Sequence, residues 1–188
     1  MKITFLKLQI TIIIVSSLSF CLFCSCKNFR GSSYDKLLVG TWKTTVHIKP
    51  EAFATESEEE IPEGMEMEMK GEETSTFHHG NKFNREGEFT VWLRNNKTDE
   101  EIPLRFYSKE AGTWKVFDET LVETTEDGIL TPLDDLTKNF VAENPDIATG
   151  ITPIKGETTS SNILSITEAK ADMEELEHHL NYTMRKKQ

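Results

Sequence analysis

The chain has 188 residues, of which 32 are acidic and 21 are lysine or arginine, so its formal net charge at pH 7 is −11. So acidic a chain repels the phosphates of nucleic acids and of anionic lipids, and neither is expected to be a partner of the protein surface. All three cysteines lie within residues 21–26, which excludes a disulfide framework. The remaining chain is long enough for one domain with its own hydrophobic core.

The first 25 residues predict a cleavable signal peptide. Lys2 and Lys7 stand near the start, and a mainly apolar stretch runs from residue 8 to residue 23. A membrane-spanning helix needs about 20 consecutive apolar residues, and this stretch is marginal for that length. Because it ends in small residues and cysteine, we expect cleavage after Ser25. Removal of two lysines and no acidic residue changes the formal net charge from −11 to −13.

Residues 22–26 (LFCSC) resemble the lipobox that lipoprotein signal peptidase cleaves. The motif has an apolar residue three positions before the modified cysteine and a small residue directly before it. Phe23 and Ser25 provide these for Cys26, whereas the two earlier cysteines each follow a phenylalanine. We therefore expect lipidation, including palmitate, on Cys26, because several acyl chains on one cysteine anchor a protein almost permanently. The alternative is an ordinary signal peptide with incidental cysteines.

The residue after Cys26 predicts the membrane to which the lipidated protein is sorted. Lys27 stands where an aspartate retains many lipoproteins of Gram-negative bacteria at the inner membrane, so we expect the outer membrane, facing the periplasm. Residues 26–35 are polar and are interpreted as a short tether for a single domain at residues 36–188. Within that domain, the acidic residues 51–64 lack the ligand spacing and turn glycine of a calcium loop and predict a solvated loop.

The domain is predicted to be all-β. Residues 64–70 alternate apolar and charged side chains, which is the period of a strand with one buried and one solvated face. Phe89, Val91 and Leu93 share one face of a second such strand, and Ile102, Leu104 and Phe106 share one face of a third. Turn signals separate the runs at His79-Gly80-Asn81, Glu86-Gly87, Asn95-Asn96 and Ala111-Gly112. Several short strands predict a sandwich or a barrel, because a second sheet or closure removes exposed edges.

Two segments depart from this β pattern. One short helix is expected at residues 132–141, where apolar residues recur at helical spacing after a proline, and a loop with two prolines and two glycines is expected after it. Residues 168–179 have two alternatives, a helix or a hairpin. A final strand is predicted from Leu180 to Lys186, because apolar and polar residues alternate there.

Three short motifs resemble lipocalins and fatty-acid-binding proteins, together called calycins. Residues 37–43 (LLVGTWK) contain the Gly-x-Trp motif that opens the first calycin strand. Residues 112–123 (GTWKVFDETLVE) resemble a hairpin common in bacterial lipocalin-like lipoproteins. Residues 182–185 (YTMR) resemble the strand that closes the calycin barrel. The resemblance implies a small antiparallel up-and-down β-barrel.

The resemblance also implies structural roles for three residues. Gly40 would let the chain turn tightly into the barrel, and Trp42 would plug the closed end. Arg185 would lie across the Trp42 indole in a cation-π contact that contributes roughly 0.5 to 2 kcal/mol. Trp114, in the second motif, has no family role to transfer and is interpreted as a packing residue.

No catalytic motif is visible, so we do not expect an enzyme. The chain has neither a nucleophile elbow nor a glycine-rich phosphate loop. The pairs His78-His79 and His178-His179 are adjacent residues, which point to opposite faces of a strand and do not easily share one metal ion. Surface histidines are the safer interpretation, and neither a metal nor another cofactor is expected.

The leading functional hypothesis is a non-enzymatic binder of a small apolar or amphipathic molecule, because small barrels can enclose one ligand. The candidate lining residues share single faces of three predicted strands: Met65, Met67, Met69, Phe89, Val91, Leu93, Ile102, Leu104 and Phe106. One alternative is a structural or protein-interaction lipoprotein with a filled barrel and an unknown protein partner. The other is an enzyme whose site is assembled from distant residues. Fold by itself does not imply function, so all three stay open.

Overall fold

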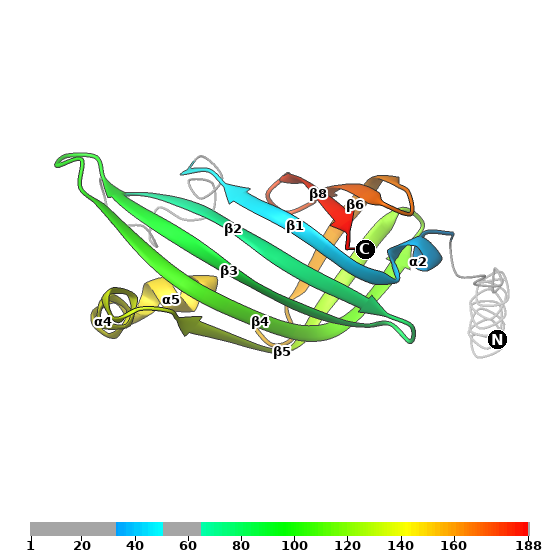
Figure 1. The fold of residues 1–188 in the computed structure, drawn as a ribbon, viewed down its shortest axis with the longest axis horizontal. Coiled ribbons are helices and arrows are strands. Elements are labelled where there is room, and N and C mark those ends of the chain that lie inside the picture. Colours follow the sequence, from blue (N-terminus) through cyan, green and yellow to red (C-terminus); the bar gives the residue numbers. More distant parts are fainter. Residues whose placement is uncertain (1–32, 51–64, 188) are drawn as a thin grey trace, which may run out of the picture. The chain divides into compact units, whose positions relative to one another are not determined.

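The described residues of the computed structural model, 33–50 and 65–187, form a closed barrel of eight antiparallel strands in sequential order (Figure 1). The strands are β1 (Gly40–Ile48), β2 (Met65–His78), β3 (Lys82–Asn95), β4 (Glu101–Phe117), β5 (Thr120–Pro132), β6 (Thr158–Ile166), β7 (Lys170–Glu175) and β8 (Asn181–Lys186). The barrel closes where β8 pairs with β1. The prediction of an all-β, up-and-down barrel is confirmed.

The N-terminal predictions fall mostly outside the described residues. The signal peptide at residues 1–25, Cys26 and most of the tether lie there, as does the acidic stretch at residues 51–64. The last tether residues begin a short helix, α2 (Ser33–Leu38), which leads directly into β1. Within the part of the chain that the structure describes, no helix has the length and apolar character needed to cross a membrane.

The connection between β5 and β6 contains two helices where the sequence predicted one helix and a loop. The first, α4 (Asp135–Glu143), starts later than residue 132 because the Asp134 side chain accepts the backbone N–H of Thr137 and caps it. The predicted loop is wrong over its first part, because α5 (Pro145–Ile151) follows at once, and is confirmed at residues 152–157. Proline fits the first turn of a helix as well as a loop, so Pro145 begins α5 rather than breaking a helix.

Two predicted turns are also wrong. Gly87 lies inside β3 and Gly112 inside β4, so these strands have 14 and 17 residues rather than being short. A Cβ at Gly87 would collide with the backbone oxygen of Glu72, and a Cβ at Gly112 with that of Thr124. The two glycines therefore permit close approach of neighbouring strands. The register of β4 against β5 shifts at Gly112, which marks a β-bulge.

The C-terminal alternatives are decided in favour of a hairpin. Residues 170–175 form β7, which pairs with β6 on one side and β8 on the other. The final strand, β8, covers residues 181–186 and agrees with the predicted strand to within one residue.

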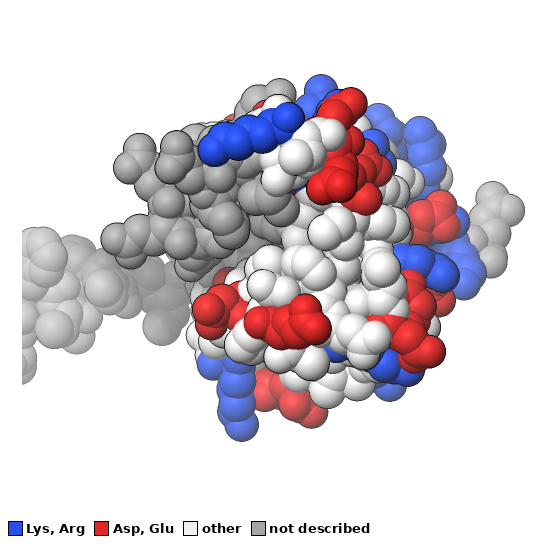
Figure 2. All heavy atoms as spheres, turned by 90° about the vertical axis from the view of Figure 1, so that its left-hand side faces the viewer, with Lys and Arg blue, Asp and Glu red and all other residues white. Residues whose placement is uncertain are grey.

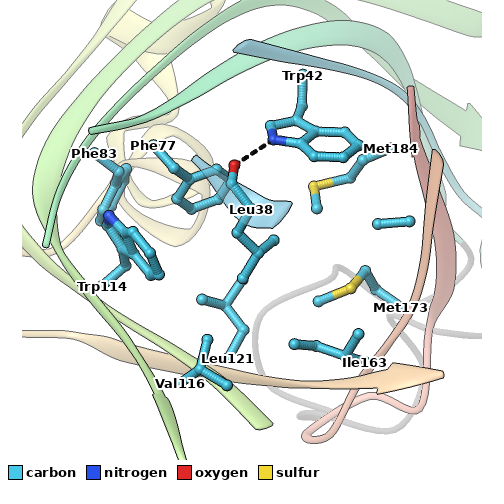
Figure 3. Close-up of a cluster of buried hydrophobic side chains, with 11 residues drawn as sticks. Leu38, Trp42, Phe77, Phe83, Trp114, Val116, Leu121, Ile163, Met173 and Met184 are labelled. Carbon is cyan, nitrogen blue, oxygen red and sulfur yellow. Dashed lines mark hydrogen bonds between the residues drawn. The ribbon is translucent and has the colours of Figure 1, made fainter. Parts of the chain in front are cut away.

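The barrel interior contains two apolar clusters. The first, here called the plug cluster, fills the end at which β1 begins (Figure 3), and its buried residues are Leu38, Trp42, Phe77, Phe83, Trp114, Val116, Leu121, Ile163, Ala171, Met173 and Met184. Within it Phe77 and Trp114 meet edge to face with ring centroids 5.6 Å apart. Trp114 is thus a packing residue, and its indole N–H donates to the carbonyl oxygen of Lys82.

The second cluster, here called the helix-covered cluster, lies on the inner faces of β3 and β4. Its fully buried members are Val91, Leu93, Leu104 and Phe106. Phe140, Val141, Ile147 and Ile151 from α4 and α5 pack against it. In Figure 1 these two helices lie beside the ends of the strands remote from α2. The helices therefore cover apolar strand surface that the barrel by itself leaves open.

Candidate functional site

Trp42 closes the barrel at the plug end. Its side chain is fully buried, and its indole N–H donates to the carbonyl oxygen of Leu38 at 2.6 Å (Figure 3). The cation over its ring is Lys186, whose Nζ lies 5.0 Å from the ring centroid. The expectation that Arg185 has this place is wrong, because Met184 is buried and the alternation along β8 turns Arg185 outward to an exposed position.

Gly40 lies where the chain passes from α2 into the barrel. Its φ of +131° belongs to a region that residues with a Cβ rarely adopt. A Cβ there would also lie 2.6 Å from Cε of Lys186. Gly40 thus gives room to the same lysine that covers Trp42.

A cavity of about 360 Å³ lies inside the barrel, away from the plug cluster. Its apolar lining comes from Val46, Ile48, Met69, Phe89, Ile151 and Leu180. Its polar lining includes Glu73, Arg85, Ser108, Glu110 and His178. The volume is within the range of roughly 300 to 1,000 Å³ that is common for small-molecule sites, and apolar walls with a few polar groups are typical of them.

Only part of the expected ligand-lining set borders this cavity. Met69 and Phe89 line it. The other expected residues whose side chains are described belong to or pack against the helix-covered cluster: Met67, Val91, Leu93, Ile102, Leu104 and Phe106. The side chain of Met65 lies outside what the structure describes. The inward direction of these strand faces was predicted well, but α4 and α5 occupy most of that surface.

Arg85 lies at the floor of the cavity, between it and the plug cluster. Its guanidinium carbon is 5.3 Å from the centroid of the Phe83 ring, and its three nitrogens each contact a different glutamate. Nη2 donates to Glu123 at 2.7 Å, Nη1 to Glu110 at 3.2 Å, and Nε lies 3.2 Å from Glu73. We call these four side chains the floor cluster.

The floor cluster was not predicted from the sequence. The signal was present, because Phe83, Arg85, Gly87 and Phe89 occupy alternate positions of one strand and share its inner face. A charged residue in such an apolar row must find a partner inside the fold. The sequence could not identify the partners of Arg85, because so acidic a chain contains many carboxylates.

Burial and charge act in opposite directions on the floor cluster. Burial by itself would lower the pKa of Arg85, but the neighbouring carboxylates outweigh it and hold that pKa well above its ordinary value. Burial raises the pKa of the Glu123 carboxyl, although the nearby guanidinium opposes this. Arg85 therefore stays charged, and the buried Glu123 holds its charge less readily than an exposed glutamate does.

Hydroxyl groups surround the floor cluster on the inner face of the barrel. Ser75 accepts a hydrogen bond from Nε of Arg85 at 3.1 Å, and Thr125 donates to Glu110. Thr44 is 4% exposed, and its Oγ1 has no hydrogen-bond partner among the described residues. A buried polar atom without a partner costs free energy, so Thr44 is a place where the interior can still accept a polar group.

The histidine pairs do not form a metal centre with each other. His78 contacts Asn84, and His178 lies by the cavity with its Nδ1 2.8 Å from Oε2 of Glu175. In the described part of the chain, the ligand atoms of Glu175, Glu177 and His178 come within 4.8 Å of one another. Glu175 already accepts the backbone N–H groups of Glu177 and His178, so the group is explained as a contact that shapes the β7–β8 turn.

Comparison with known proteins does not assign the chain to a family. No protein-family model matches it, and no curated protein is significantly similar in sequence. The topology of the barrel and the chemistry of its cavity therefore carry the functional argument.

Proposed function

We propose that the protein is a cell-envelope lipoprotein whose lipocalin-like domain binds a small apolar or amphipathic molecule and catalyses no reaction. The observation that carries this proposal is the cavity of about 360 Å³ inside the closed barrel, whose lining combines apolar side chains with polar groups, among them Arg85 and Glu110 of the floor cluster. Such a cavity suits a molecule that has an apolar body and one polar end.

The lipocalin-like assignment is supported by the sequential eight-stranded barrel and by the plug at its end. Trp42 follows Gly40 at the start of β1 and is buried beneath the cation of Lys186. The motifs in the sequence point the same way, but a barrel of this topology has no single function, and so the cavity must be tested directly.

The lipoprotein assignment is supported by the lipobox-like residues 22–26 and by the apolar stretch before them. Lys27 supports the outer membrane, facing the periplasm. The barrel takes all its strand partners from residues 40–186, so protein expressed from residue 27 onward keeps the entire barrel and serves for binding experiments in water.

The binding proposal is tested by titrating this protein with Nile red, a neutral dye whose fluorescence rises in an apolar site. We expect saturable binding at one site. Val46→Trp should abolish it by filling the cavity, whereas Thr45→Trp, on the exposed face of the same strand, should leave it unchanged. Absence of saturable binding in the folded wild-type protein would favour the alternative, a structural or protein-interaction lipoprotein.

A further inference from the structure

The floor of the cavity carries more carboxylates than cations. Glu73, Glu110 and Glu123 surround the single guanidinium of Arg85, so the floor cluster has a formal charge of −2 when all four side chains are ionised. With Glu123 protonated, two carboxylates still face one cation. Protonation of Glu123 thus reduces the excess of negative charge but does not remove it.

We infer that the ligand of this cavity has a cationic head, such as the ammonium group of a lipophilic amine, rather than a carboxylate. The inference rests on the proposed function, because it assigns the head group of the molecule that the cavity binds. A single arginine inside a barrel would ordinarily favour a carboxylate ligand, because guanidinium groups pair well with carboxylates. Here the contacts of Arg85 remove that preference.

All three nitrogens of the Arg85 guanidinium already have partners within the protein. Each of its three nitrogens lies within 3.2 Å of a glutamate oxygen, and its Nε also donates to Ser75. A carboxylate ligand that displaced one of these glutamates would leave the displaced charge unpaired in a half-buried site. A carboxylate that entered without displacing one would meet Glu73 and Glu110, which line the cavity with Arg85.

The floor still has hydrogen-bond acceptors for a donor to satisfy. Oε1 of Glu73 contacts Arg85 and Ser75, and its Oε2 accepts no hydrogen bond from any described residue. The unpartnered hydroxyl of Thr44 shares the inner face of β1 with Val46 and Ile48, which line the cavity. Because an ammonium group has up to three N–H donors and a positive charge, it complements both the free oxygens and the charge excess.

The apolar wall of the cavity and the outer surface around α4 and α5 differ from the floor cluster in charge. Val46, Ile48, Met69 and Phe89 form an apolar lining suited to a hydrocarbon chain. Outside, at the end of the barrel with α4 and α5, uncharged atoms fill the middle of the visible face and side chains of both signs lie around it (Figure 2). Glu72 and Glu88 also border the cavity but are exposed, so selection by charge inside it is assigned to the partly buried floor cluster.

The test compares three ligands with the same chain and different heads: dodecylamine, dodecanol and dodecanoate. The affinity of each ligand is measured by its displacement of Nile red from the protein at pH 7, at ligand concentrations below the critical micelle concentration. We expect dodecylamine to bind most tightly, dodecanol less so, and dodecanoate at least about tenfold more weakly than the amine, the size of one charged contact. Equal or tighter binding of dodecanoate would overturn the inference while leaving the proposed function intact. Absence of binding by the dye and all three ligands would overturn both.

A matched pair of variants ties the preference to the floor cluster. Glu73→Gln keeps the shape of the side chain and should lower the ratio of amine to carboxylate affinity by about tenfold. Glu86→Gln removes the same charge from the exposed outer face of β3 and should change the ratio less than about twofold, because exposed charges are screened. The thermal midpoint of each variant checks that it is folded. An equal effect of the two substitutions would show that overall charge, not the cavity floor, selects the ligand.

Discussion

Lys186 lies directly opposite Trp42 in the β1–β8 pairing and places its ammonium group 5.0 Å from the centroid of the indole ring. The same ammonium donates to the carbonyl oxygen of Leu37 at 3.1 Å, near the end of α2. A cation is favourable there, because the last carbonyl groups of a helix have no partner within the helix. One side chain of the last strand thus ties together the plug, the entering helix and the closure of the barrel.

Trp42→Ala should be among the most destabilising substitutions in the domain. The indole is fully buried in the plug cluster, and removal of a large core side chain typically costs about 3 to 5 kcal/mol. Urea denaturation followed by far-UV circular dichroism measures the free energy of unfolding. An unchanged denaturation midpoint would mean that Trp42 does not close the barrel.

Lys186→Met should lower the free energy of unfolding by about 1 to 2 kcal/mol, because it removes the cation over Trp42 and the hydrogen bond to Leu37. Its neighbour offers the control. Arg185 is exposed on the outer face of β8, so Arg185→Met should change the free energy by no more than about 0.5 kcal/mol. The same denaturation measurement applies, and a larger effect of the Arg185 substitution would contradict the assignment.

Val91→Trp should destabilise the fold rather than block ligand uptake. Val91 is fully buried in the helix-covered cluster, where added volume has no cavity to enter, and overpacking typically costs about 1 to 3 kcal/mol. Differential scanning calorimetry should therefore show a lower midpoint than for Val46→Trp, whose new ring has the cavity available. The opposite order of midpoints would place the empty space beside Val91.

Asp172 should contribute to the stability of the domain in a pH-dependent way. Hydrogen bonds from Lys170, Thr183 and Ser165 lower its pKa from 3.8 to about 2, so the folded protein holds this proton less tightly than the unfolded chain. The contribution is complete above pH 3.8 and is lost as the pH falls towards 2.

The variant Asp172→Asn lacks this ionisation, so its thermal midpoint should fall less steeply than that of the wild type between about pH 5 and pH 2. The two proteins are compared by thermal melts at several pH values in one ionic strength. Parallel curves for the two proteins would contradict the role of Asp172 as a link from β7 to both of its neighbouring strands.

Cys26→Ser should abolish lipidation and release the protein into the soluble fraction. The expectation follows from Ser25 and the apolar stretch before it, since an acylated cysteine is the only anchor we propose. Cell fractionation and incorporation of labelled palmitate measure it, with Cys24→Ser as the matched control that should remain lipidated. A wild-type protein that takes up no palmitate would exclude the lipoprotein assignment.

The β character of the domain is determined by the sequence itself. Residues 64–70 alternate apolar and charged side chains, and every second residue is apolar in 89–93 and in 102–106. Successive side chains of a strand point to opposite faces. The pattern is local, so it predicts both the strand and its inner face before any partner is known. The structure confirms strands at all three places. The Gly-x-Trp motif is local in the same sense, and it lies at the start of β1.

Features that depend on a neighbouring strand were decided only by the tertiary structure. The local sequence predicted turns at Gly87 and Gly112. Each of these glycines instead lies in a strand where the backbone of the adjacent strand is too close for a Cβ. The choice between Arg185 and Lys186 depends on a shift of one residue, which reverses the face of every side chain in a strand.

The floor cluster shows the same limit more fully. Glu73, Arg85, Glu110 and Glu123 come from four successive strands, β2 to β5, and no local pattern pairs a given glutamate with Arg85. The register of the closed barrel brings them together, and the long-range packing of α4 and α5 decides which of the apolar strand faces remains open as a cavity. Contacts between residues distant in sequence depend on the strand register and on the packing of α4 and α5. For this reason the sequence indicated a barrel but not the chemistry of its interior.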